Sequence, residues 1–117
     1  MAEVNLVPKE VVADKNYQVL SINGEIDRDT NTSFRESMEQ FLATYAYTNL
    51  ILDLKELAFI NSEGIGYITD VFNRFTAQNK KIVIINASER IMDIFNLVGL
   101  NQMIPCLGSE EEAVNSF

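Results

Sequence analysis

The stretch that decides the fold runs over residues 50–66 and reads LILDLKELAFINSEGIG. Its first part, residues 50–54 extended by residues 57–60, is an almost unbroken apolar run of strand length. Such a run is typical of a central strand, or of a strand covered by helices on both faces. From Ile65 onward, apolar residues recur at helical spacing. The sequence therefore predicts a core strand that passes directly into a helix, with Asn61-Ser62-Glu63 at the junction.

Strand and helix patterns alternate on both sides of this stretch. Upstream, apolar and polar residues alternate over 4–7, continued by 11–12, and over 17–22, which predicts two strands, the second ended by Asn23-Gly24. Apolar residues at helical spacing predict a helix over 30–47. Downstream, the sequence predicts a strand over 82–85, a helix from the Ser88 cap to Gly99, a strand over 104–107 and a last helix after Ser109. This alternation predicts one α/β domain over residues 1–117.

Composition and charge narrow the function classes. The chain has 117 residues, of which 47% are apolar and 22% charged, as in an ordinary globular domain. Its net charge of −8 disfavours nucleic acid and anionic membrane surfaces as partners. No apolar run approaches the ~20 residues of a membrane span, and the acidic start does not resemble a signal peptide. We therefore expect a cytoplasmic protein without a membrane partner.

The inventory of chemically reactive residues is thin. There is no histidine and only one cysteine, Cys106, which lies in an apolar stretch and is expected to be a buried structural thiol. Asp53 could suggest a phosphoacceptor, but the acidic pair and lysine that such a site requires are missing, so a strand-end carboxylate is the preferred interpretation. The sequence predicts no catalytic site, no metal and no cofactor.

The junction between the core strand and its helix is the remaining candidate site. Ser62 is predicted to cap the helix, beside free backbone N–H groups and the positive end of the helix dipole. Gly64 and Gly66 leave the first turn bare, so the hydroxyl would be open to a partner, and a phosphate would be tolerated there. Capping by Ser62 without any regulatory role remains the alternative.

Several segments together resemble the bacterial anti-sigma factor antagonists of the STAS domain family. They follow the family in order and spacing over nearly the whole chain: residues 24–27 (GEID), 52–54 (LDL), 59–66 (FINSEGIG), 82–86 (IVIIN), 94–100 (IFNLVGL) and 109–113 (SEEEA). The resemblance implies a four- to five-stranded mixed sheet with about four α-helices, and a phosphorylatable serine, here Ser62. Asn61 stands where the family usually has aspartate, and Glu63 where a second serine or threonine is common.

The resemblance also implies a mechanism and partners. Members of this kind bind, when unphosphorylated, an anti-sigma factor that is also a serine kinase, which releases the sigma factor. Phosphorylation ends the association, and a serine phosphatase would reverse it. The partner-binding residues expected here are Asp27, Asn61, Glu63, Gly64 and Ile65, in a monomer or weak dimer. Asp27 has an alternative role, because loop aspartates commonly cap a following helix, as Asp29 or Thr30 also could.

Two other functions stay open. One is a non-switching STAS adaptor of a transporter or sensory complex, in which Ser62 only caps its helix. The other is a small-molecule binder or enzyme that uses a pocket near the second helix, although reactive side chains are scarce.

Overall fold

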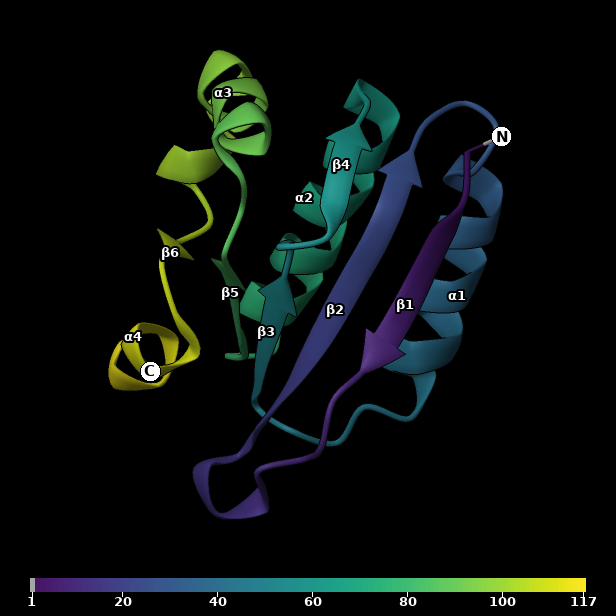
Figure 1. The fold of residues 1–117 in the computed structure, drawn as a ribbon. Helices are drawn as coiled ribbons and strands as arrows, with labels where there is room; N and C mark the ends of the chain where they lie inside the picture. Colours follow the sequence, from purple (N-terminus) through teal and green to yellow (C-terminus); the bar gives the residue numbers. More distant parts are fainter. Residues whose placement is uncertain (1) are drawn as a thin grey trace.

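The computed structural model describes residues 2–117 and contains one mixed sheet with helices on both faces (Figure 1). The strands are β1 (Val4–Pro8), β2 (Tyr17–Ile26), β3 (Asn49–Asp53), β4 (Leu57–Ile60), β5 (Lys81–Ile85) and β6 (Cys106–Leu107). The helices are α1 (Asn31–Ala43), α2 (Ser62–Ala77), α3 (Glu89–Val98) and α4 (Glu110–Asn115), with 3₁₀ turns at Ala13–Lys15 and Leu100–Gln102. The predicted α/β class, mixed sheet and helices are confirmed.

The strand order is β1-β2-β3-β5-β6, and β4 pairs with β2 beyond the end of β3. Only β1 runs antiparallel to its neighbour; the other pairs are parallel. Figure 1 shows α1 and α2 on one face of the sheet and α4 on the other. The larger core lies under α1 and α2, and a smaller one, centred on Tyr17, Ile51 and Ala113, lies under α4.

The predicted single core strand is in fact two strands. Residues 54–56 form a turn in which Leu57 N–H donates to Leu54 O at 3.1 Å. The ten-residue strand β2 pairs with β3 along its first half and with β4 along its last residues. The sheet therefore has six strands, and the expected count of four to five was too low because β2 is long enough to serve two partners.

The sequence suggested that Asn23-Gly24 ends the second strand, and this prediction was wrong. Strand β2 continues to Ile26, with a register shift after Gly24. Gly24 has φ +107°, and a Cβ there would lie 2.1 Å from the Glu3 carbonyl oxygen. Glycine is needed here because the backbone at Glu3 approaches it closely within the sheet, not because the chain turns.

The boundaries of two other elements also differ. Val12 forms only an isolated bridge with Tyr17, so residues 11–12 do not extend β1. Helix α1 ends at Ala43. The apolar period that predicted a helix to residue 47 includes Tyr45, whose hydroxyl donates to the Asn49 carbonyl from the following loop.

The topology places two chain segments at one edge of the sheet. Ile26 and Ile60 end the parallel strands β2 and β4 and are paired in register. Asn61 N–H donates to Ile26 O at 2.9 Å. Residues 27 and 61 therefore leave the sheet side by side, one toward α1 and the other into α2. Within residues 2–117, the helices are all too short or too polar to span a membrane.

Candidate functional site

The cap of helix α2 is Asn61, and Ser62 is the first helical residue. Asn61 has extended backbone angles, and its side-chain oxygen accepts a hydrogen bond from Gly64 N–H at 2.9 Å. The prediction that Ser62 caps this helix was wrong by one residue, because asparagine is as good a cap as serine and precedes it. Because Asn61 provides the cap, the Ser62 hydroxyl is not needed to cap the helix.

Ser62 is exposed, and its hydroxyl forms no hydrogen bond with any residue between 2 and 117. Its side chain belongs to the first turn of a 16-residue helix, where backbone N–H groups lack intrahelical acceptors and the dipole is positive. Glu63, beside it, is also exposed. The site therefore offers a free hydroxyl in surroundings that stabilise an added negative charge on the helix itself.

Gly64 and Ile65 lie beneath this surface. Gly64 is buried, and a Cβ there would lie 2.6 Å from Ile26 Cγ2 and 3.0 Å from Ile60 Cγ1. Ile65 is 8% exposed and belongs to the larger core. These two predicted partner-binding residues offer little area to a partner; they hold the first turn of α2 tightly against β2 and β4.

Asp27 organises the turn that leads from β2 into α1. Its Oδ1 accepts hydrogen bonds from the backbone N–H groups of Asp29 at 2.9 Å and Thr30 at 3.1 Å. In return, the Thr30 hydroxyl accepts from Asp27 N–H and donates to Glu25 O. Of the residues considered as caps, Asp27 thus supplies the carboxylate, while Thr30 makes no side-chain cap bond within α1.

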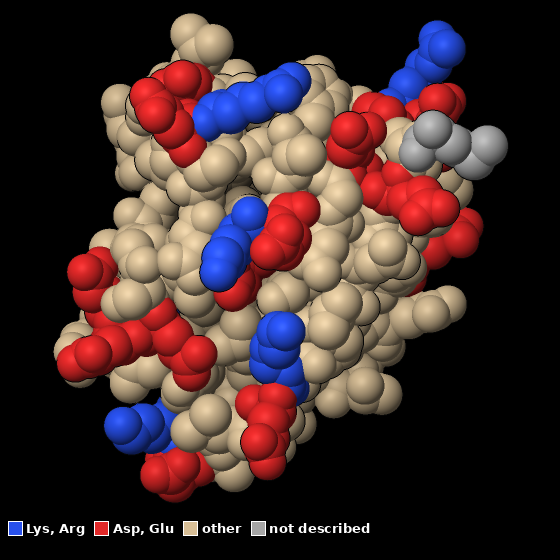
Figure 2. All heavy atoms as spheres, viewed as in Figure 1, with Lys and Arg blue, Asp and Glu red and all other residues tan. Residues whose placement is uncertain are grey.

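Acidic side chains surround this edge of the sheet. Asp27 is half-buried, whereas Glu25, Asp29 and Glu63 are exposed. Figure 2 shows acidic side chains gathered over the end of the sheet where β2 ends. A phosphate at Ser62 would add negative charge directly beside the exposed carboxylate of Glu63.

A groove between α1 and α2 was missed by sequence reasoning. It has a volume of about 580 Å³ and is lined by Gly66 and Tyr67 together with Arg35, Glu39, Glu63, Asp70 and Arg74. Gly66 is exposed, and a Cβ there would meet nothing within 4 Å. The signal in the sequence was a glycine on the outer face of the helix, one turn beyond Ser62.

Glu39 of α1 lines this groove and is hydrogen-bonded to two residues of α2. Its carboxylate accepts two hydrogen bonds from Arg74, at 2.7 and 3.1 Å, and one from the Tyr67 hydroxyl. The hydrogen bonds from Arg74 and Tyr67 lower the pKa of Glu39. Burial and the bond to Glu39 raise the pKa of Tyr67, so the tyrosine stays neutral and donating at physiological pH.

Asp53 makes a local hydrogen bond to the backbone, and Cys106 is partly buried. Asp53 Oδ1 accepts from Lys55 N–H at 3.0 Å, as expected of a strand-end carboxylate. Cys106 is half-buried, and burial raises the pKa of its thiol to about 11. Between residues 2 and 117, His, Cys, Asp and Glu side chains nowhere gather in a group that could hold a metal ion.

Two proteins named anti-sigma-B factor antagonist are similar to this chain in sequence. The anti-sigma-B factor antagonist of Bacillus subtilis is 27% identical over 105 residues, covering 90% of this chain and 94% of the relative. The protein of the same name from Listeria monocytogenes is 25% identical over 99 residues, covering 85% and 86%.

Solved structures show the same fold. A crystal structure of an anti-sigma factor antagonist from Mycobacterium paratuberculosis matches with a TM-score of 0.83 at 17% identity, over 97% of this chain and 93% of that one. SpoIIAA in its unphosphorylated form matches with a TM-score of 0.72 at 23% identity, over 97% and 95%. The phosphorylated form of SpoIIAA, from Bacillus, matches at 0.65 and 23% identity, over 97% and 98%.

The STAS domain family model matches residues 9–113, which include every strand from β2 onward and the site around Ser62. With the fold and relatives in agreement, the chain belongs to the STAS domain family.

Proposed function

We propose that this protein is an anti-sigma factor antagonist controlled by phosphorylation of Ser62. In its unphosphorylated form it binds an anti-sigma factor that is also a serine kinase, which releases the sigma factor. Phosphorylation ends the association, and a serine phosphatase restores it. The observation that carries the proposal is the free, exposed hydroxyl of Ser62 in the first turn of α2, in a chain similar to proteins named anti-sigma factor antagonists.

The helix itself tolerates the phosphate. Because Asn61 provides the cap, modification of Ser62 removes no hydrogen bond from the start of α2. A phosphate at the first helical position lies near the positive end of the dipole and near free N–H groups. The fold is therefore expected to stay intact when Ser62 is phosphorylated.

A docked partner would not tolerate it. A phosphoserine carries about −1.5 to −2 charges at neutral pH. At about 5 Å from a partner carboxylate and an effective dielectric constant of ~20, one pair of unit charges costs roughly 3 kcal/mol, or about a hundredfold in affinity.

The test compares phosphorylation and binding with the cognate anti-sigma factor kinase. With ATP, the kinase is expected to add one phosphate to the wild type and none to Ser62→Ala. Ser62→Ala should keep full affinity in the presence of ATP, and Ser62→Asp should bind roughly tenfold to a hundredfold more weakly by calorimetry.

Ser37→Asp is the matched control, because Ser37 is an exposed helical serine on α1. It should bind the kinase as the wild type does. Equal affinity of the wild type, Ser62→Ala and Ser62→Asp would contradict the switch and support a STAS adaptor that does not switch.

A further inference from the structure

A second cavity lies at the other end of α2 from Ser62. Its volume is about 600 Å³, and it lies between the C-terminal part of α2, the start of β5, the segment before β6 and α4. Phe72, Val83, Met103 and Pro105 make its lining predominantly apolar, and Lys80 and Lys81 are the charged residues among those that line it. Among residues 2–117, those that line it include no Asp or Glu, in a chain with a net charge of −8.

The cavity exists because β6 is short. Ile84 N–H donates to Pro105 O at 2.9 Å, and β5 and β6 pair only at Ile84–Cys106 and Ile85–Leu107. In a parallel ladder, the next bond toward the start of β5 would run from the N–H of residue 105 to Ile82 O. Proline has no N–H, so the ladder stops and the sheet edge beside Ile82 stays without a neighbouring strand.

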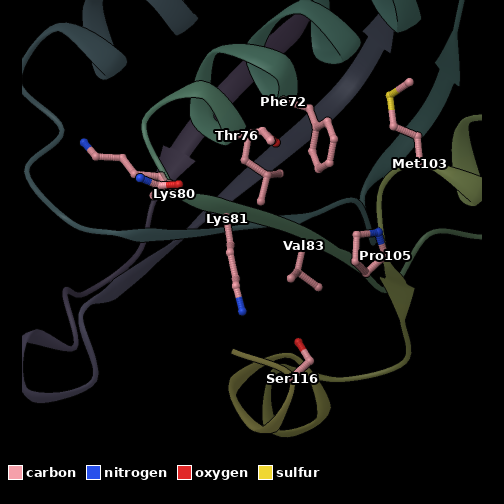
Figure 3. Close-up of a pocket in the computed structure, with 10 residues that line it drawn as sticks. Phe72, Thr76, Lys80, Lys81, Val83, Met103, Pro105 and Ser116 are labelled. Carbon is pink, nitrogen blue, oxygen red and sulfur yellow. The ribbon is translucent and has the colours of Figure 1, made fainter.

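The two sides of this edge differ in chemistry. Figure 3 shows Lys81, Val83 and Ser116 on one side of β5, and Phe72 and Met103 on the other, with Pro105 at the end of the gap. Met103 is 45% exposed, so part of this apolar side chain reaches the surface. The apolar surface therefore continues around the edge of the strand to a cation.

Lys81 is the cation available to a ligand. Lys80 lies three residues beyond Ala77, the last residue of α2, and is half-buried, and Figure 3 shows its side chain directed away from Lys81. Lys81 is exposed, and in the described chain it takes part in no salt bridge. The Ser116 hydroxyl already donates to Ala113 O at 2.6 Å, so it has no proton left for an anion.

An added peptide strand fits this edge poorly. Ile82 is only 1% exposed, so its backbone groups are already covered by their surroundings. A cavity of this volume with a mainly apolar lining and one available cation is typical of a small-molecule site.

We propose that this cavity binds a small amphiphile with an aliphatic body and a single anionic head group. The aliphatic body packs against Phe72, Met103 and Pro105, and the anionic head pairs with Lys81. The site is at the opposite end of α2 from Ser62, and it depends neither on phosphorylation nor on the anti-sigma factor.

The experiment is a titration of the ¹⁵N-labelled full chain with decanoate, below its micelle concentration, followed by amide chemical shifts. Saturable shifts are expected at Ile82, Val83, Met103 and Ser116. Decyl phosphate should bind at the same amides, whereas neutral decanol and cationic decyltrimethylammonium should bind more weakly. Equal binding of decanol and decanoate would overturn the role of Lys81, and shifts spread over the surface or absent from these amides would overturn the site.

Two pairs of variants test the contacts. Lys81→Glu should weaken decanoate binding by about threefold to tenfold, since an attractive charge becomes repulsive, whereas Lys55→Glu, the same change at an exposed lysine elsewhere, should not. Met103→Glu should abolish binding, whereas Leu97→Glu, at a side chain that is 87% exposed and outside the cavity, should not. Equal effects within either pair would refute the proposal, and thermal unfolding checks that all four variants fold.

This outcome is separable from that of the proposed function. Lys81→Glu should leave the affinity for the anti-sigma factor kinase and its dependence on Ser62 unchanged. In the wild type, absence of decanoate binding with an intact Ser62 switch would refute only this proposal, and decanoate binding without a Ser62 switch would refute only the proposed function.

Discussion

Two glycines in the first turns of α2 have opposite surroundings, and they make opposite predictions. Gly64→Ala places a methyl group 2.6 Å from Ile26 Cγ2, so we expect it to lower the free energy of unfolding by about 1 to 3 kcal/mol. Gly66→Ala fills open space on an exposed helical position, so it should raise that free energy by about 0.5 to 1 kcal/mol. Urea unfolding measures both, and changes of the same sign would contradict the described packing.

The roles of Asn61 and Ser62 at the start of α2 can also be separated by stability. Asn61→Ala removes the bond to Gly64 N–H and should cost about 1 kcal/mol, whereas Asn61→Asp keeps a capping oxygen and should cost little. Ser62→Ala should change the free energy of unfolding by less than about 0.5 kcal/mol. A larger loss in Ser62→Ala than in Asn61→Ala would mean that the serine is the cap.

At the scale of elements, Glu39 links α1 to α2. It accepts two hydrogen bonds from Arg74 and one from Tyr67. The two helices also meet where the Phe34 ring packs edge-on against the Tyr67 ring and the Arg35 guanidinium lies over it. Glu39→Gln should lower the free energy of unfolding by about 1 kcal/mol, because the site is exposed and partly screened. Asp70→Asn is the control, since Asp70 lies 3.9 Å from Arg74 on the same helix, and it should change little.

The contribution of Glu39 should depend on pH. The hydrogen bonds from Arg74 and Tyr67 hold its pKa below the ordinary value of 4.5. A lowered pKa in the folded state stabilises the protein above pH 4.5, and this stabilisation is lost as the pH falls through the folded-state pKa. The difference in stability between the wild type and Glu39→Gln should therefore be constant at neutral pH and decrease in acid; an unchanged difference would show that Glu39 is not ionised in this network.

At the scale of the whole molecule, the sheet has a large core under α1 and α2 and a small one under α4. Ala113 is fully buried in the small core. Ala113→Asp places an unpaired carboxylate there and should cost about 3 kcal/mol or more in urea unfolding. Asn115→Asp, on the exposed side of the same short helix, should cost less than about 0.5 kcal/mol; similar losses in both would mean that α4 does not cover the sheet in solution.

The alternation of apolar runs and helical periods was sufficient to predict the α/β class and the order of helices, because these patterns are local, whereas the mixed sheet was expected only from the family resemblance. What local patterns could not show was which strands pair. The run over residues 50–60 reads as one strand, and only the length of β2, which pairs with both β3 and β4, divides it. Asn23-Gly24 reads as a turn, and only the close approach of Glu3 to Gly24 shows that this glycine lies within the sheet.

The candidate site was likewise predicted in part from local patterns and decided in part by the tertiary structure. The order of Asn61, Ser62 and the glycines along the chain was enough to place an open helix start directly after a buried strand, since capping preferences and glycine spacing act over a few residues. The tertiary structure decided which of these side chains are free: Asn61 takes the cap, Gly64 and Ile65 turn inward, and Ser62 remains exposed. It also brought Asp27 beside them and opened the cavity next to Pro105, because both depend on the pairing of strands that are distant in sequence.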